Sequence, residues 1–389
     1  MKKGMRALSL LLVMALLGAV FVPAVSAVEK MDNKKIIEIA EKYVKDISNE
    51  YYDYADWKNC YIEKDYTFYD PFGQINAYSY QLFDSKKNQG YILIGSKSED
   101  YKLLEFSKGN IIPEENIESI KRVIQSETGR DIQINSDKEI SMIYCGPFSY
   151  FVKYENPDSK EELIFDLYAQ EFLSKKEITL LNDDYITYKK EKNLVVGTNA
   201  EQDLLTKSKS VRGTVFISNL NDVPFYQQPS HLPSSCAPVA AAMILAYWSE
   251  NGYPNIETGN SDGTELIESL CDSMHTIIGY GSGKGTAFSN VGPGIRTEIS
   301  NSGYSFNTVG DNTWLYYSWA KSEIDNDYPF FMELFNCGVW TKHCVSAIGY
   351  KEGSSGDFIT VHTGWSDMSN KEIAWGSWWG ASAVYVHPT

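Results

Sequence analysis

The sequence predicts an α+β protein made of two domains. In the first half, short strand-like runs joined by short loops outnumber the amphipathic helices, which favours an antiparallel sheet with helices on one face. In the second half, apolar helices come first and strands follow, which favours a second α+β unit. With 389 residues, the chain is long enough for both. We expect the domains to span residues 28–190 and 215–389, with a linker over 191–214.

Residues 1–27 have the pattern of a secretory signal peptide. Three basic residues within the first six positions precede an apolar run over 7–22, and a small-residue cleavage site ends at Ala27. Removing these three charges takes the formal net charge from −16 to −19. Such an acidic chain is a poor partner for nucleic acid or an anionic membrane surface, and no later stretch is apolar enough to span a bilayer. We expect a secreted, extracellular protein without a membrane span.

The first domain is expected to combine two amphipathic helices with a series of strands. Apolar residues recur at helical spacing from Ile36 to Ile47, and a second helix over Pro113–Thr128 stops at Gly129. A polar hairpin loop is expected over Asp84–Gly90. This half contains no histidine and no catalytic constellation. The expected strands are Cys60–Tyr69, Gln74–Phe83, Tyr91–Ser96, Lys102–Phe106, Ile140–Tyr154, Glu162–Ala169 and Tyr185–Lys190.

The linker over 191–214 is polar, and Lys207, Lys209 and Arg212 lie in its second half among Ser, Thr and Gly. Exposed segments of this composition are where proteolysis concentrates. The linker is therefore either a cleavage site between the two domains or an ordinary connector.

The second domain is expected to begin with an apolar helix that starts at Cys236, followed by more helices and then strands. The Gly-rich segment Gly279–Gly294 lacks the spacing of a phosphate-binding loop, and we expect a loop that frames a cleft. The other expected helices are Thr264–Ile278, Ile295–Ser302 and Trp314–Asp325, and the expected strands are Tyr328–Phe335, His343–Tyr350, Phe358–His362 and Ala383–His387.

One cysteine lies at the start of the apolar helix. Ser234 and Ser235 can cap this helix, and Pro238 suits its first turn, where a missing N–H costs nothing. The N-terminus of a helix is electropositive, which favours a thiolate over a thiol at Cys236. The alternative is that Cys236 is a small apolar residue in a buried helix.

A cysteine nucleophile needs a base, and all five histidines lie in the second domain. His343 begins an apolar strand, whereas His231 lies in the loop before Cys236 and His362 lies on a neighbouring strand. The six cysteines include no CxxC pair and the histidines form no HExxH motif, so we expect no metal and no organic cofactor. One or two disulfides are compatible with an exported protein.

These segments carry a resemblance to a known family. VPFYQQ, SSCAPVAAAMILAYW, HCVSAIGY and ITVHTGW, in this order, resemble the papain-like cysteine peptidases of bacterial secreted type. The nearest group is that of the bacteriocin-processing, double-glycine-cleaving peptidases, and the streptopain group is a more distant neighbour. The resemblance covers roughly Val215–Thr389. It implies a papain-like fold, in which a helix bearing the cysteine packs on an antiparallel sheet, and a protein or peptide substrate.

The resemblance also implies roles for individual residues. Cys236 matches the nucleophile, and His343 matches the general base and acid. A glutamine before the cysteine matches the donor to the oxyanion that forms on the attacked carbonyl. Gln228 is the preferred candidate for this donor, and Gln227 remains open.

Two positions depart from the family pattern. Ala237 replaces the usual glycine after the cysteine, and Thr363 stands where the family has the Asp or Asn that orients the histidine. Thr363 offers a hydroxyl as a weak acceptor, and Asp367 or His362 are the alternatives for this role. The catalytic set that the resemblance implies is thus Cys236, His343, Gln228 and Thr363.

Gly90–Gly109 has a weaker likeness to the propeptides of streptopain-like enzymes. It implies that residues 28 to about 210 form an inhibitory or folding-assisting prodomain that contacts the catalytic domain in cis. The alternative is a permanent accessory domain.

For the whole chain, the leading function is a secreted cysteine peptidase. The alternatives are a Cys–His amidase or acyltransferase on cell-wall substrates, and a catalytically impaired homologue that acts as a binding or surface-interaction module.

Overall fold

The computed structural model describes the chain from residue 33 onward, with gaps. The described residues are 33–96, 102–129, 140–156, 160, 162–167, 171–196, 216–256, 258–279, 283–311, 315–335, 342–365 and 368–388. The predicted signal peptide and residues 197–214 of the predicted linker lie outside them. Contacts divide the chain into two compact units, residues 1–39 and 40–389, and every interaction below lies within the second.

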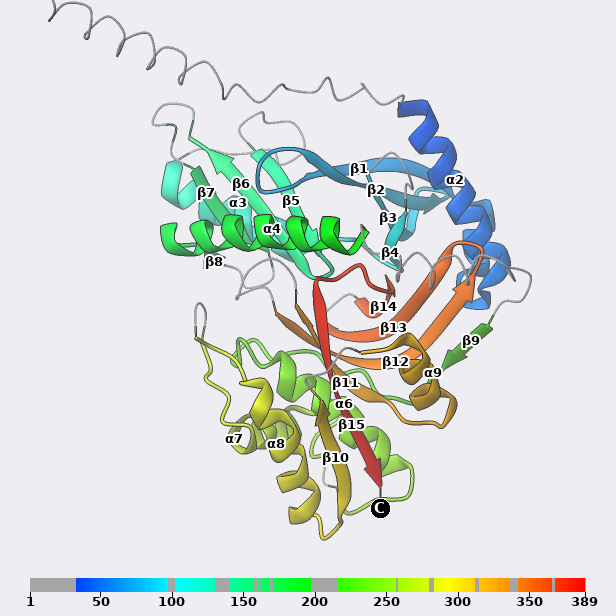
Figure 1. The fold of residues 1–389 in the computed structure, drawn as a ribbon, viewed down its shortest axis with the longest axis vertical. Coiled ribbons are helices and arrows are strands. Elements are labelled where there is room, and N and C mark those ends of the chain that lie inside the picture. Colours follow the sequence, from blue (N-terminus) through cyan, green and yellow to red (C-terminus); the bar gives the residue numbers. More distant parts are fainter. Residues whose placement is uncertain are drawn as a thin grey trace, which may run out of the picture. The chain divides into compact units, whose positions relative to one another are not determined.

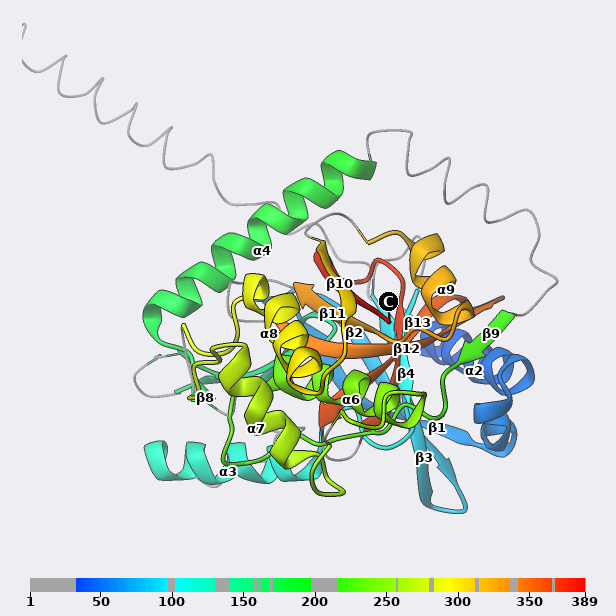
Figure 2. The same cartoon turned by 90° about the horizontal axis from the view of Figure 1, so that it is seen from below.

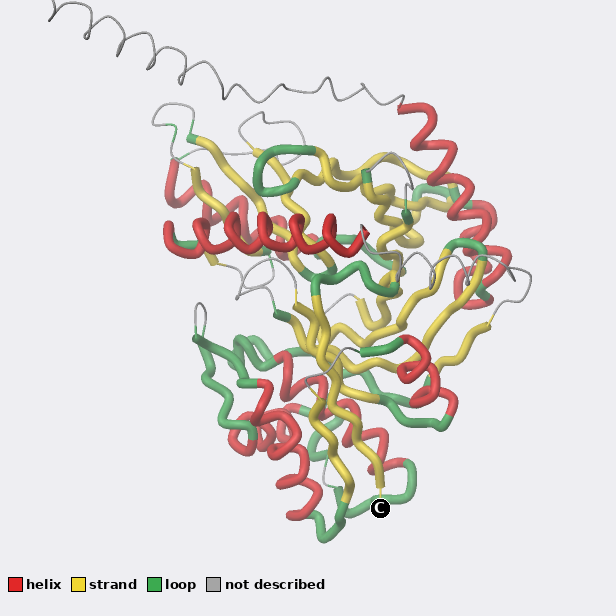
Figure 3. The backbone as a smooth tube through the Cα atoms, viewed as in Figure 1, coloured by secondary structure: helices red, strands yellow, loops and turns green. Residues whose placement is uncertain are grey.

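One large sheet organises the second unit (Figures 1 and 3). Its strands are β1 (Tyr61–Tyr69), β2 (Ile75–Asp84), β3 (Lys87–Gly95), β4 (Leu103–Ser107), β5 (Ile140–Gly146), β6 (Ser149–Glu155), β7 (Glu162–Asp166), β8 (Glu171–Phe172), β9 (Phe216–Asn219), β10 (Phe306–Asp311), β11 (Phe330–Phe335), β12 (His343–Gly353), β13 (Gly356–Trp365), β14 (Met368–Ala374) and β15 (Gly380–Pro388). The strand order is β10-β15-β11-β12-β13-β14-β4-β3-β2-β1-β5-β6-β7-β8, and β9 pairs with β12. Of the described pairings, β1 with β5 is parallel and the others are antiparallel. Together with the helices, this confirms the predicted α+β class.

Strands β4 and β14 join the strands of the two predicted domains. Glu372 pairs with Phe106, and Ile373 pairs with Glu105. Beside them, the fully buried Lys371 ammonium lies 2.9 Å from the Glu105 carboxylate. Removing either partner would leave an uncompensated buried charge. The pair therefore favours the register of β4 and β14 that keeps Lys371 beside Glu105. The sheet is therefore continuous, while the division into domains over 28–190 and 215–389 stays a prediction.

The helices are α2 (Asn33–Glu50), the 3₁₀ helix η1 (Tyr52–Asn59), α3 (Glu114–Thr128), α4 (Lys175–Val196), α6 (Cys236–Glu250), α7 (Thr264–Ser273), α8 (Phe288–Asn301) and α9 (Tyr317–Asp325). The predicted stop of α3 is confirmed, because Gly129 has a φ of 70° and its N–H donates to the Gln125 carbonyl at 2.8 Å. None of the helices in the described ranges is both long and apolar enough to cross a membrane.

Helix α4 occupies the place of a predicted strand (Figure 2). The strand prediction for Tyr185–Lys190 is wrong because a capping box starts a helix upstream. The Ser174 N–H donates to the Glu177 carboxylate at 2.7 Å, and the Glu177 N–H donates to the Ser174 hydroxyl at 3.3 Å. This Ser-x-x-Glu signal outweighs the β-prone residues further along the chain.

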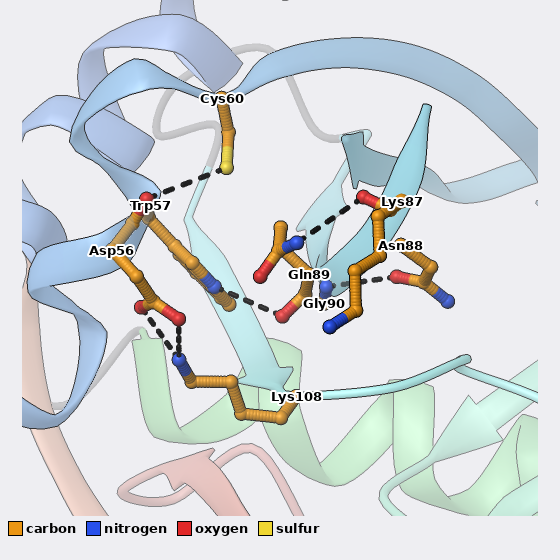
Figure 4. A network of polar contacts seen from close by, with 8 residues as sticks. All are labelled: Asp56, Trp57, Cys60, Lys87, Asn88, Gln89, Gly90 and Lys108. Atoms are coloured by element: carbon orange, nitrogen blue, oxygen red, sulfur yellow. Dashed lines mark hydrogen bonds and ion pairs between the residues drawn. The ribbon is translucent and has the colours of Figure 1, made fainter. Parts of the chain in front are cut away.

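The hairpin between β2 and β3 is tighter than the loop predicted over Asp84–Gly90. The chain turns at Ser85 and Lys86, whose φ values are 50° and 72°, and β3 already begins at Lys87. Gly90 is therefore a strand residue, and a Cβ there would collide with the Trp57 ring (Figure 4). The Trp57 Nε1–H donates to the Gln89 carbonyl at 3.1 Å, so the ring is held against β3 at Gly90.

The Gly-rich segment is a loop over only part of its predicted length. Helix α8 begins at Phe288 and continues through Pro293, so the second part of Gly279–Gly294 is helical. Glycine is required at position 294 because a Cβ there would collide with Met274, which follows α7. The glycines therefore allow two helices to approach closely as well as forming a loop.

Helix α6 is buried from Ala237 to Trp248 and packs on β11, β12 and β13. A helix that is apolar on all sides needs such an environment. The predicted caps do not form. The Ser235 hydroxyl donates to the Leu232 carbonyl at 2.7 Å, the Ser234 hydroxyl donates to the Gly279 carbonyl at 2.6 Å, and no side chain caps the helix. Both serines shape the loop before Cys236, and the first N–H groups of α6 are left without a side-chain acceptor.

Candidate active site

Cys236 and His343 meet where α6 and β12 begin. Cys236 is the first residue of the helix, and His343 is the first residue of the strand. The helix packs on the strand, and the imidazole lies close enough to the Cys236 side chain to lower the pKa of its thiol through a hydrogen bond and its charge. The fold thus brings together the two residues that the sequence singled out as candidate nucleophile and base.

The backbone of β13 holds His343 on its other side. The His343 Nε2 lies 2.9 Å from the Thr363 carbonyl oxygen. Because a carbonyl oxygen can only accept, Nε2 carries a proton, and Nδ1 is the ring nitrogen left for the Cys236 thiol. His343 is only 7% exposed, so bulk water competes poorly for this hydrogen bond. The contact therefore fixes both the tautomer and the orientation of the ring.

Thr363 contacts His343 through its main-chain carbonyl, whereas the sequence suggested its hydroxyl for this contact. That hydroxyl accepts a hydrogen bond from the Trp365 N–H at 3.1 Å. The carbonyl oxygen of Thr363 is an amide oxygen, as is the side-chain oxygen of an asparagine, and it accepts from an imidazole in the same way. The lack of Asp or Asn at this position therefore does not leave His343 without an acceptor.

Gly364 explains why two successive carbonyls face the site. Its φ is +75°, in the left-handed region, and the pairing of β13 with β14 is irregular between His362 and Trp365. The carbonyl of Thr363 is directed to His343, and the carbonyl of Gly364 accepts from the Gln228 N–H at 2.8 Å. A Cβ at Gly364 would also lie 3.1 Å from a methyl group of Val239, so glycine suits both the turn and the packing.

The two candidate glutamines differ in their surroundings. Gln228 is half-buried, and its backbone is tied to the residue that follows Thr363. Gln227 is exposed. A donor to an oxyanion must be held in place, because catalysis depends on donors that need no reorganisation. Gln228 is the better placed of the two.

The surroundings of Cys236 lower the pKa of its thiol well below the usual range. The largest cause is a hydrogen bond from the Cys344 thiol, burial opposes it, and the hydrogen bond and charge of His343 add to the lowering. Cys344 is 7% exposed, and sequence reasoning missed it although it is the residue after His343. The site therefore stabilises a thiolate at Cys236.

Aromatic rings cover the imidazole. The Trp365 ring stacks on His343 with centroids 4.0 Å apart, and the Phe148 ring lies 4.8 Å from His343 and 5.0 Å from Trp365. Phe148 is buried and has a φ of 65°, which is unusual for a phenylalanine. It lies in the turn between β5 and β6, and no signal in the sequence links this position to the site.

The buried carboxyl group of Glu333 lies near the thiols of Cys236 and Cys344. Glu333 on β11 pairs in register with Cys344 and is 3% exposed, and burial raises the pKa of its carboxyl to about 7, against the opposing charge of Lys342 at 3.8 Å. A negative charge at Glu333 disfavours a thiolate at Cys236, because the two charges repel. A single acid within the apolar run Tyr328–Phe335 was the available sequence signal.

The His362 and His231 rings contact other groups. The His362 Nε2 lies 3.0 Å from the Val223 carbonyl. The exposed His231 lies 3.0 Å from the Glu268 carboxylate. Asp367 lies outside the described residues. Within the described ranges, no group of three or more His, Cys, Asp or Glu side chains suits a metal ion.

Thr363→Val tests whether the main chain orients His343. We expect the alkylation rate of Cys236 by iodoacetamide at pH 7 to stay within about threefold of the unchanged protein, because the carbonyl that holds His343 is retained. Loss of the hydroxyl removes the contact to the Trp365 N–H, at a cost of about 1 kcal/mol of stability. A fall as large as that caused by His343→Ala would contradict the assignment.

The chain is similar to two solved structures and to one family model. No curated protein matches the chain. A C39-like peptidase from Bacillus anthracis shares 14% identity at a TM-score of 0.32, covering 45% of this chain and 99% of that one. A prointerpain A fragment from Prevotella intermedia shares 11% identity at a TM-score of 0.41, covering 84% and 98%. The segment that carries Gln228, Cys236, His343 and Thr363, residues 220–384, matches the model of the family described as Peptidase_C39 like.

Proposed function

We propose that this protein is a cysteine peptidase that hydrolyses peptide bonds through a thioester intermediate. The observation that carries the proposal is the hydrogen-bonded pair of Cys236 and His343, with the imidazole fixed by the Thr363 carbonyl at 2.9 Å. The likeness of residues 220–384 to C39-like peptidases supports the same class of reaction.

The pair supplies both the nucleophile and the proton that the reaction needs. The Cys236 thiolate attacks the carbonyl carbon of the peptide bond and forms a tetrahedral intermediate. His343 donates its Nδ1 proton to the leaving amine as the C–N bond breaks, which leaves a thioester on Cys236. His343 then takes a proton from water as the water attacks the thioester. The C–S bond breaks, the acid leaves, and the Cys236 thiolate beside the protonated His343 is restored.

The start of α6 offers a place for the developing oxyanion. The Cys236 N–H lies at a helix terminus that no side chain caps, and the Gln228 side chain is the proposed second donor. Each such donor lowers the barrier by about 3 kcal/mol in enzymes of this kind. The positive end of the helix acts in the same direction.

We further propose that the protein is made as a proenzyme and acts outside the cell. The Phe148 ring, from the predicted propeptide-like domain over 28–190, lies 4.8 Å from His343. A ring at this position occupies space beside the imidazole that a substrate would need. Export is proposed from the signal-peptide pattern over residues 1–27, and separation of the two halves from the composition of residues 191–214.

The test compares the intact chain with a chain cut by a site-specific protease at a recognition sequence inserted within residues 191–214. Each is incubated with casein, and new amino termini are counted and located by mass spectrometry. We expect hydrolysis to be faster after the cut, by at least about tenfold, and to be abolished by prior treatment with iodoacetamide. Equal rates before and after the cut would contradict the proenzyme proposal and leave the peptidase proposal intact.

Two outcomes would overturn the peptidase proposal. Release of amide fragments from purified peptidoglycan, with casein left intact, would assign the pair to a cell-wall amidase or acyltransferase. Selective labelling of Cys236 without hydrolysis of either substrate would assign the chain to a binding module with an impaired site.

A further inference from the structure

A second thiol lies beside the candidate nucleophile, at the interface where α6 packs on β12. The Ser346 hydroxyl on β12 donates to the Ala240 carbonyl on α6 at 2.8 Å. Two residues back along the strand is Cys344, about 7 Å away, and one turn back along the helix is Cys236, about 6 Å away. Both cysteines thus lie close to the Ser346–Ala240 contact on the interface of α6 with β12, and each thiol shifts the pKa of the other through a hydrogen bond.

The two thiols are chemically unequal. Both are free, Cys236 is half-buried and Cys344 is buried. The pKa of Cys236 is lowered, whereas the hydrogen bond to Cys236, burial and the nearby Glu333 raise the pKa of Cys344 well above its usual range. Cys236 is thus the thiolate that attacks an oxidant first, and Cys344 is the neighbouring thiol.

We propose that Cys236 and Cys344 form a reversible oxidation site that reacts with peroxides and closes as a disulfide. The site rests on the geometry of the two thiols, and only its consequence, loss of the nucleophile, rests on the proposed peptidase function. The oxidised form cannot attack a peptide bond. A low-molecular-weight dithiol reduces the disulfide and restores the free thiol of Cys236. The pair therefore protects Cys236 from oxidation beyond the sulfenic acid.

The chemistry balances with one peroxide for each disulfide. The Cys236 thiolate attacks a peroxide oxygen and the O–O bond breaks. Cys236 becomes a sulfenic acid, and the hydroxide or alkoxide that leaves takes up a proton from the solvent. The Cys344 sulfur then attacks the Cys236 sulfur, the S–O bond breaks, and the Cys344 proton leaves with the hydroxyl group as water. The two thiols lose two electrons, and the peroxide gains them.

The test uses the full chain, hydrogen peroxide and disulfide mapping after trypsin. Cleavage after Lys342 and Lys351 gives a peptide in which Cys344 is the single cysteine, whereas Cys236 shares the peptide 213–284 with Cys271. We expect a disulfide between these two peptides, loss of Cys236 alkylation by iodoacetamide, and recovery of alkylation with dithiothreitol. Cys271→Ser is the matched control, in which the disulfide is expected to persist.

Cys344→Ser supplies the decisive comparison. In this variant we expect peroxide to convert Cys236 to sulfinic acid, with at least tenfold less alkylation recovered by dithiothreitol than in the unchanged chain. Recovery equal to that of the unchanged chain would overturn the proposal, as would a disulfide from Cys236 to Cys337 or Cys271. The readouts are disulfide formation and alkylation, so failure of peptide hydrolysis in a separate assay leaves this result interpretable.

Discussion

Cys236→Ala is expected to reduce peptide hydrolysis by about 10⁴-fold or more. The substitution removes the atom that forms the thioester, and in enzymes with a nucleophile–histidine pair the loss of either member removes most of the acceleration. The helix should remain intact, because Ala is a strong helix former and α6 is already rich in alanine. The rate of casein hydrolysis by the cut chain measures the effect.

Cys60→Ala is the matched control for this prediction. Cys60 is also free and half-buried, but burial and the neighbouring Asp56 raise the pKa of its thiol (Figure 4). We expect its replacement to change the rate by less than twofold. A chain that still hydrolyses casein after Cys236→Ala would place the reaction at another residue.

His343→Ala is expected to lower the rate of Cys236 alkylation at pH 6 by at least about tenfold. His343 lowers the pKa of Cys236 through its hydrogen bond and its charge, and without it the thiol pKa moves up towards the ordinary value of about 8.5. A lower pKa keeps the thiolate at lower pH, so the loss is largest in acid and shrinks as the pH rises. The hydrogen bond from Cys344 remains, which limits the size of the shift.

His231→Ala tests whether His231, which precedes Cys236 closely in the sequence, contributes to the reactivity that we assign to His343. His231 is exposed and lies beside Glu268, so its removal should leave the alkylation profile within about twofold of the unchanged protein. If both histidine variants shift the profile equally, the assignment of His343 as the partner of Cys236 is contradicted.

The elements of the fold could be predicted where periodicity and helix signals agree. The stop of α3 at Gly129 and the apolar strands around His343 follow from local sequence. Helix α4 differs from the predicted strand because the capping box at Ser174 outweighs the β-prone residues that follow it. The pairing of β4 with β14 joins segments more than two hundred and fifty residues apart, and local patterns carry no information on such contacts.

The candidate site could be predicted in part, because local sequence signals mark two of its residues. Cys236 and His343 stand out because each begins an apolar element, and chemistry needs both residue types. The Thr363 carbonyl could not be foreseen, since its direction depends on the left-handed backbone at Gly364 and an irregular strand pairing. Phe148 reaches the site from a turn in the other half of the chain, which only the three-dimensional structure reveals.

The pH dependence of Cys236 alkylation in the unchanged protein tests most directly whether the site holds a thiolate beside an imidazole. Iodoacetamide labelling is followed by mass spectrometry from pH 4 to pH 10, with Cys60 as the internal reference. We predict that the midpoint for Cys236 lies clearly below the ordinary thiol value of about 8.5, and that the midpoint for Cys60 lies above it. A Cys236 midpoint equal to or above that of Cys60 would contradict the account.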